Sequence, residues 1–275
     1  MPSTISKDRT IAALAEVWAS LGDLLGALDD EQWAAATPLP GWDVQDNVSH
    51  IVGTEAMLAG EPGPALEIDR EANVHVRNDI GVVNEQWVAS MRSVAPGEVL
   101  GRFRELTTAR LATLGAMSDE EWNAESFTPA GKDTFGRFMQ IRVFDCWLHE
   151  QDIRDATGRP GHESGLAVDI VLDEMSTALG FVVGKKAGAT PGQSVTFVLT
   201  EGASIVRRLH VEVAERAAVV DELTGPPTVV LTMPVGVMTR RCAGRVASHE
   251  LLDQVVIDGD LSLASKILEN QSYTI

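Results

Sequence analysis

The spacing of apolar residues changes near residue 160, and this change divides the chain into two regions that must fold differently. Before it, apolar residues recur every three or four positions, which is the period of an amphipathic helix. After it, short runs of β-branched and aromatic residues appear between helical segments. The sequence therefore predicts a helical domain at residues 1–160 and a small α+β domain at residues 161–275, so the expected fold class is α+β overall.

The first region contains long helical patterns separated by breaks. We expect helices at residues 6–28, 44–59, 81–94, 96–117 and 133–156. Four long antiparallel helices, a four-helix bundle, are the simplest arrangement for them. In the second region we expect a helix at 164–183, strands at 195–200, 205–213, 227–232 and 255–258, and helices at 233–242 and 260–269.

Composition narrows the classes of partner. Acidic residues outnumber basic ones by 40 to 22 among 275 residues, and the net charge is −18. Nucleic acids and anionic membranes need basic patches, so we expect neither as a partner. The chain has no apolar stretch of transmembrane length and no visible secretory signal, and its two cysteines lie far apart. These features favour a cytoplasmic protein.

A line of polar residues runs along the predicted helix at 133–156. Arg142, Asp145, His149 and Asp152 are spaced three, four and three apart, so they share one helical face between large apolar neighbours. The predicted helix at 44–59 carries a second polar line with His50. If the two lines face each other, the interior of the bundle receives two imidazoles and a carboxylate.

Asp145 and His149 have a spacing that suits metal chelation. Residues four apart on a helix project together, so a carboxylate oxygen and an imidazole nitrogen can reach one divalent ion. His50 would complete a set of two histidines and one carboxylate, which leaves coordination positions open for water or substrate. On spacing alone, an ion pair or hydrogen bond between Asp145 and His149 is the commoner interpretation.

Three segments resemble signatures of a known family. The segment LPGWDVQDNVSH at residues 39–50, the segment RVFDCWLHEQDIR at 142–154 and the region from His75 to Trp87 are similar to the mycothiol-dependent maleylpyruvate isomerase family, part of the DinB-like superfamily. The resemblance spans roughly residues 10–160. The later part of the chain, most clearly VVIDGDLSLA at 255–264, resembles the sterol-carrier-like domain that is often appended to this family.

The resemblance implies a DinB-like four-helix bundle that binds a divalent metal, usually zinc, through His, Glu and His. These ligands match His50, Asp145 and His149 here. The departure is Asp145 in place of Glu, one methylene shorter, which puts strict zinc preference in doubt. The resemblance also implies mycothiol, a low-molecular-weight thiol, as cofactor or co-substrate together with a small electrophile.

The expected chemistry follows from the charge of the ion, because a divalent cation favours the thiolate over the thiol. Addition of the thiolate to a conjugated double bond and its departure would isomerise that bond, whereas displacement of a leaving group would make the protein a thiol S-transferase. Arg142 is a candidate for binding a substrate or thiol carboxylate, or else for neutralising Asp145 or Asp46. Asp152 is a candidate for fixing the tautomer of a ligand histidine, or else for a surface salt bridge.

Two other functions stay open from the sequence. The bundle could keep a metal for stability while the second domain binds an apolar ligand, in which case the protein is not an enzyme. Alternatively, a metal-bound water could make it a hydrolase. A homodimer is also possible.

Overall fold

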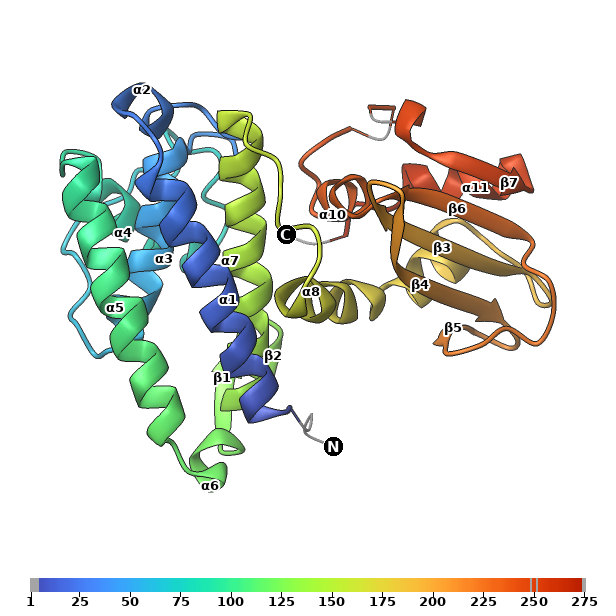
Figure 1. Cartoon of the computed structure of the whole chain (residues 1–275), viewed down its shortest axis with the longest axis horizontal. Coiled ribbons are helices and arrows are strands. Elements are labelled where there is room, and N and C mark those ends of the chain that lie inside the picture. Colours follow the sequence, from blue (N-terminus) through green and yellow to red (C-terminus); the bar gives the residue numbers. More distant parts are fainter. Residues whose placement is uncertain (1–4, 248, 251, 274–275) are drawn as a thin grey trace. The chain divides into compact units, whose positions relative to one another are not determined.

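The structure is a computed structural model that describes residues 5–247, 249–250 and 252–273. It consists of two compact units (Figure 1), of which the first ends at His162 and the second begins at Glu163. From the sequence, the boundary is expected after residue 160. The outermost residues of both predicted domains lie outside the described residues.

The first unit is built from helices. They are α1 (Lys7–Gly26), α2 (Asp30–Trp33), α3 (Val44–Leu58), α4 (Asp79–Met91), α5 (Pro96–Ala116), α6 (Asp119–Trp122) and α7 (Phe135–Thr157), with the strands β1 (Glu125–Thr128) and β2 (Gly131–Thr134) before α7. α1 packs against α5 and α7, and α3 packs against α4, α5 and α7. The expected helical bundle is therefore confirmed, and α3 and α7 are neighbours within it.

Apolar residues at helical spacing explain this packing. The buried face of α1 carries Leu14, Val17, Leu21 and Leu25, each at most 1% exposed. α7 ends at Gly158, whose φ of +63° gives the left-handed C-terminal cap that glycine adopts without steric cost. Each of these helices turns its apolar face toward the core of the unit.

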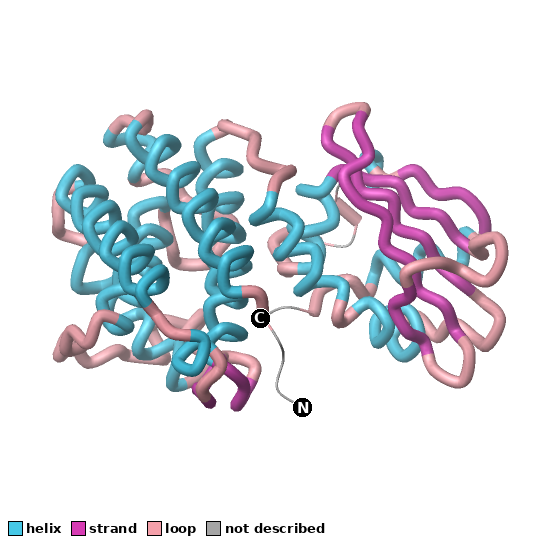
Figure 2. Tube along the Cα trace, turned by 60° about the horizontal axis from the view of Figure 1, so that its bottom comes forward, coloured by secondary structure: helices cyan, strands magenta, loops and turns pink. Residues whose placement is uncertain are grey.

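The start of α7 differs from the prediction. The sequence predicts that this helix begins at residue 133, but residues 131–134 form β2, which pairs antiparallel with β1 (Figure 2). The hydroxyl of Thr134 then accepts a hydrogen bond from the Arg137 amide at 3.1 Å and caps the helix. Two strands of four residues carry too few alternating positions to be recognised from sequence alone.

The second unit combines a sheet with short helices. Its elements are α8 (Leu166–Ser176), α9 (Leu179–Phe181), a π-helical turn (Val182–Lys186), β3 (Ser194–Glu201), β4 (Ser204–Val213), β5 (Ala217–Val220), β6 (Val229–Pro234), α10 (Val235–Cys242), a 3₁₀ turn (Leu252–Gln254), β7 (Val256–Gly259) and α11 (Leu261–Glu269). The strands lie in the order β5-β4-β3-β6-β7, with β3 parallel to β6 and the other pairs antiparallel. This is the expected α+β architecture.

The core of the second unit contains apolar side chains from alternate positions of its strands. Val195, Phe197 and Leu199 of β3 are fully buried, and α9, α10 and α11 pack against the sheet. Two predictions are corrected here: the helix expected at 164–183 is interrupted between α8 and α9, and β5 was not expected. At Gly180 a Cβ would lie 2.8 Å from the carbonyl oxygen of Ala217, so the close approach of β5 requires a residue without a side chain there.

Candidate metal centre

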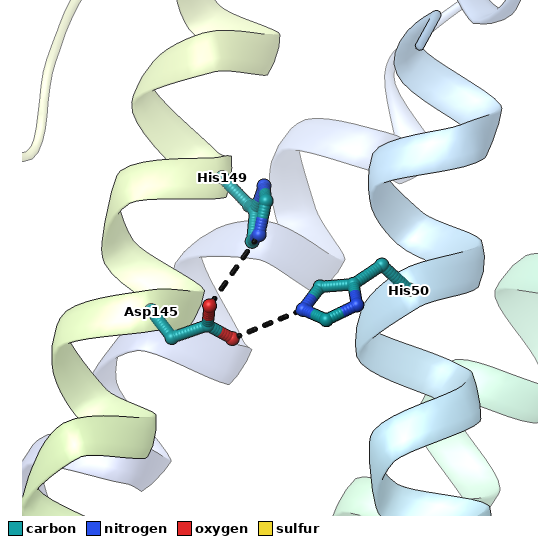
Figure 3. A group of neighbouring side chains, drawn as sticks. All are labelled: His50, Asp145 and His149. Atoms are coloured by element: carbon teal, nitrogen blue, oxygen red, sulfur yellow. Dashed lines mark ion pairs between the residues drawn. The ribbon is translucent and has the colours of Figure 1, made fainter. Parts of the chain in front are cut away.

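Helices α3 and α7 bring His50, Asp145 and His149 together (Figure 3). One donor atom from each lies within 4.8 Å of the others. The Nε2 atom of His50 is 3.4 Å from Asp145 Oδ2, and the Nε2 atom of His149 is 3.5 Å from Asp145 Oδ1. Two imidazoles therefore face one carboxylate, and the two polar lines recognised in the sequence meet at this point.

The start of α3 sets the position of His50. Asp43 caps this helix by accepting a hydrogen bond from the Asp46 amide at 2.8 Å, and the Asp46 side chain accepts one from the Asp43 amide. Such a reciprocal capping box satisfies backbone donors that the first turn leaves unpaired. His50 lies seven residues after the cap, about two turns along the helix, on the face toward α7.

Asn47 fixes the tautomer of His149. The amide nitrogen of Asn47 donates to the Asp43 carbonyl at 2.8 Å and to the Thr37 hydroxyl at 3.1 Å. Its amide oxygen therefore faces His149 Nδ1, at 2.7 Å. An amide oxygen only accepts hydrogen bonds, so Nδ1 is a donor and Nε2 is the ring nitrogen that faces Asp145.

The sequence predicts either this tautomer-fixing role or a surface salt bridge for Asp152. The structure places Asp152 Oδ2 at 3.8 Å from His149 Nδ1, beyond hydrogen-bond range, while Asn47 is in contact. Asp152 is buried rather than on the surface. Asn47 belongs to the polar line of α3, but spacing along one helix could not show that it reaches a histidine on another.

The protonation states of His50 and Asp145 suit a metal ligand set. Burial lowers the pKa of His50, although Asp145 opposes this effect, so the imidazole is neutral at pH 7. Burial alone would raise the pKa of Asp145, but His50, Arg142 and His149 hold it well below the usual value. A neutral imidazole and an ionised carboxylate are the forms that bind a metal.

Arg142 is paired inside the bundle. Its Nε and Nη2 atoms donate to Glu55 Oε1 at 3.2 and 3.0 Å, and its Nη1 donates to Asp145. Glu55 also accepts from Arg110 at 2.9 Å. All of these except Asp145 are less than 10% exposed. Of the two roles expected for Arg142, the arrangement matches neutralisation of Asp145, whereas Asp46 is paired with Arg92 instead.

The region that contains the ligand set is similar to a known protein family. The model of the mycothiol maleylpyruvate isomerase N-terminal domain family matches residues 14–154, which include His50, Asp145 and His149. The chain belongs to this family. Both polar lines lie inside the matched range.

Solved structures extend the likeness in fold beyond the matched family range. The crystal structures of the mycothiol-dependent maleylpyruvate isomerase and of a histidine-to-alanine mutant of it align with TM-scores of 0.56 and 0.54. Each alignment covers 94% of this chain and 95% of that structure at 15% identity. At this identity the likeness concerns the fold, and it includes the sheet-containing second unit.

Curated relatives share sequence with half of the chain. Two uncharacterized proteins of Mycobacterium tuberculosis, from strains CDC 1551 and H37Rv, are 25% identical over 142 residues. These alignments cover 50% of this chain and 52% of each relative. The chain thus spans about half the length of the curated relatives it matches.

An aromatic ring and a second buried carboxylate adjoin the ligand set. The ring of Trp42 lies with its centroid 5.4 Å from that of His50 and 5.9 Å from that of His149. Its Nε1 donates to Glu85 Oε2 at 2.9 Å. Trp42, His75 and Glu85 all lie in segments that carry the family resemblance, but no sequence pattern singled out Glu85, which is on α4 and only 1% exposed.

Both cysteines are buried free thiols. Burial raises the pKa of Cys146 to about 12, so its thiol is protonated at neutral pH. Cys242 is likewise buried, with a pKa raised to about 12 by burial. None of the described helices combines the length and apolar character needed to cross a membrane.

Proposed function

We propose that the protein is a divalent-metal enzyme that uses mycothiol, either as an isomerase of the maleylpyruvate type or as a thiol S-transferase. One observation carries this proposal: three donors from α3 and α7 converge within 4.8 Å of one another, in a chain of the mycothiol maleylpyruvate isomerase family. His50, Asp145 and His149 would hold the ion, and three protein ligands would leave positions open for a thiol.

The donor set fits such an ion. The Nε2 atom of His149 and the carboxylate of Asp145 are directed toward the same point as His50, and Asn47 holds His149 from behind as outer residues do in metal sites. A bound divalent cation would supply the positive charge that favours a thiolate at neutral pH. Arg142 would position the Asp145 carboxylate and leave its other oxygen directed toward His149.

The metal itself is a separate part of the proposal. Zinc is the first candidate because two imidazoles and one carboxylate form a common catalytic zinc set. The shorter side chain of Asp145 could equally suit nickel, iron or manganese. Loading the metal-free protein with each ion in turn and measuring dissociation constants would rank them.

The substitution His149→Ala tests the ligand set. We expect the variant to lose bound metal, as measured by elemental analysis, and to keep its far-ultraviolet circular dichroism, because the helices do not depend on this imidazole. His210→Ala is the matched control, since His210 is bonded to Thr196 in the second unit. Equal metal content in His149→Ala and the parent protein would contradict the proposal.

The use of mycothiol is tested on the metal-loaded protein. We expect calorimetry to detect mycothiol binding that is lost after chelation of the metal, and activity toward maleylpyruvate or another electrophile only when the thiol is present. Equal affinity with and without metal would remove the link between metal and thiol. Turnover of the substrate without thiol would support a hydrolase. Binding of an apolar ligand without any turnover would support a binding protein.

A further inference from the structure

A cluster centred on Glu85 lies behind the proposed metal ligands and has no part in the proposed function. Glu85 is only 1% exposed, and its Oε2 accepts hydrogen bonds from Trp42 Nε1 at 2.9 Å and from His75 Nε2 at 3.0 Å. Its Oε1 lies 2.8 Å from Arg92 Nη2. Burial would raise the pKa of Glu85, but His75, Trp42 and Arg92 lower it, so the carboxylate is ionised and holds all three.

The opposite side of this cluster contacts the metal ligands. The Trp42 indole is tilted by 37° against the His50 ring and by 33° against the His149 ring, and the two imidazole centroids are 4.8 Å apart. The rotation of a histidine ring about its terminal torsion is otherwise broad. An indole packed against both rings limits that rotation, and Glu85 limits the movement of the indole.

The backbone near Trp42 is fixed as firmly as its ring. Gly41 has a φ of +82°, and a Cβ there would lie 2.8 Å from His75 Nδ1, so both the turn and the neighbouring imidazole require glycine. The Thr37 hydroxyl donates to the Trp42 carbonyl at 2.8 Å and accepts from Asn47. The segment that carries Trp42 is thereby joined to the amide that orients His149.

We propose that Trp42, tethered by Glu85, is a positioning residue that presets the orientation of the His50 and His149 imidazoles for the ion. This inference rests on the proposed function, since it assumes that these imidazoles bind a metal. Loss of outer residues around a metal site lowers metal affinity by about 10- to 100-fold. We expect effects of that size when the indole or its tether is removed.

Two substitutions separate the ring from its tether. Trp42→Phe keeps an aromatic ring but removes the N–H that Glu85 accepts, and Trp42→Leu removes the aromatic ring altogether. We expect the affinity for Co²⁺, measured by competition with a chromophoric chelator, to fall by about 10-fold in the first and toward 100-fold in the second. The visible absorption of bound Co²⁺ should also change, because it reports ligand geometry.

Trp122→Phe is the matched control. Trp122 is a buried tryptophan of the first unit whose indole N–H donates to the backbone carbonyl of Ile5 at 2.9 Å. We expect this variant to lose stability but to keep the parent Co²⁺ affinity and spectrum. Should Trp42→Leu fail to fold, Trp42→Phe and Glu85→Gln carry the test, because both conserve the shape of the side chain they replace more closely.

The outcomes distinguish this inference from the proposed function. Parent affinity and spectrum in folded Trp42→Phe and Glu85→Gln would overturn the positioning role while leaving the metal site intact. A parent protein that binds no Co²⁺, or binds it equally well after His149→Ala, would overturn the proposed function and this inference with it. Weaker binding and an altered spectrum in both Trp42 and Glu85 variants, with Trp122→Phe unchanged, would support the inference.

Discussion

The two units bury polar groups to different extents. In the first unit, the buried side chains among the described residues include nine acidic or basic ones, namely Asp46, His50, Glu55, Glu85, Arg110, Arg142, His149, Glu150 and Asp152. In the described part of the second unit, Arg241 is the only acidic or basic residue that is buried. Since burying charge is costly unless it is paired, the first unit gives up stability that an apolar core would supply.

This difference in buried charge shows that the first unit has the specialised interior. The strands of the second unit follow simple alternation, and their buried side chains serve packing. The helices of the first unit place a chain of ion pairs beside the three metal-ligand candidates, from Arg110 through Glu55 and Arg142 to Asp145. Substitutions in the two interiors should therefore have different consequences for metal binding.

The largest expected loss of stability comes from the apolar interior. Phe197→Ala should reduce the free energy of unfolding by about 4 kcal/mol, because it removes a fully buried aromatic side chain from β3 and leaves a cavity. Urea denaturation followed by circular dichroism measures this. The Co²⁺ affinity should stay at the parent value, and a weakened affinity would mean that the two interiors are coupled.

A substitution in the charged interior of the first unit should change both the free energy of unfolding and the metal affinity. Glu55→Gln leaves Arg110 and Arg142 buried without their common carboxylate, and we expect a loss of about 3 kcal/mol in the free energy of unfolding. Metal affinity should also fall, since Arg142 would then pair with Asp145 alone. Glu125→Gln, which affects an exposed pair with Lys132, is the control and should cost less than about 1 kcal/mol.

The smallest expected effect is on the pH dependence of the free energy of unfolding. His162 contacts Glu150 through Nδ1 at 2.7 Å and Glu16 through Nε2 at 3.1 Å. Burial opposes its protonation, but the two carboxylates raise its pKa above 6.5. Protonated His162 thus stabilises the fold fully below pH 6.5, and this contribution is lost as pH rises through the higher folded pKa.

The measurement is the free energy of unfolding between pH 5 and pH 9. Each unit of difference between the folded and unfolded pKa corresponds to about 1.4 kcal/mol. His162→Gln should remove this part of the pH dependence. An unchanged profile in the variant would show that the pairs with Glu16 and Glu150 do not contribute to stability.

Much of the fold follows from the sequence because periodicity is a local property. The long helices of the first unit and the strands β3, β4 and β6 were expected within a few residues of their observed ends. The β1–β2 hairpin and β5 were not, since strands of four residues lack a clear period and depend on their partners. The sterol-carrier-like character of the second unit, a homodimer and a cytoplasmic location stay predictions.

The candidate site was predicted in part for a similar reason. Asp145 and His149 lie four apart on one helix, so their convergence could be expected from spacing, while the addition of His50 depended on the assumption that the polar lines of two helices face each other. Asn47 on α3 contacts His149 on α7, and Glu85 on α4 contacts Trp42 beside the ligands. The spacing of residues within one helix contains no information on such contacts.

The hydrogen bond between Asn47 and His149 has a consequence for how an ion would enter. With Nδ1 committed to Asn47, His149 can offer a cation its Nε2 atom alone, and a neutral His50 and an ionised Asp145 have no proton to give up when the cation arrives. Uptake of a divalent ion by His50 and Asp145 near pH 7 should therefore release almost no acid into an unbuffered solution.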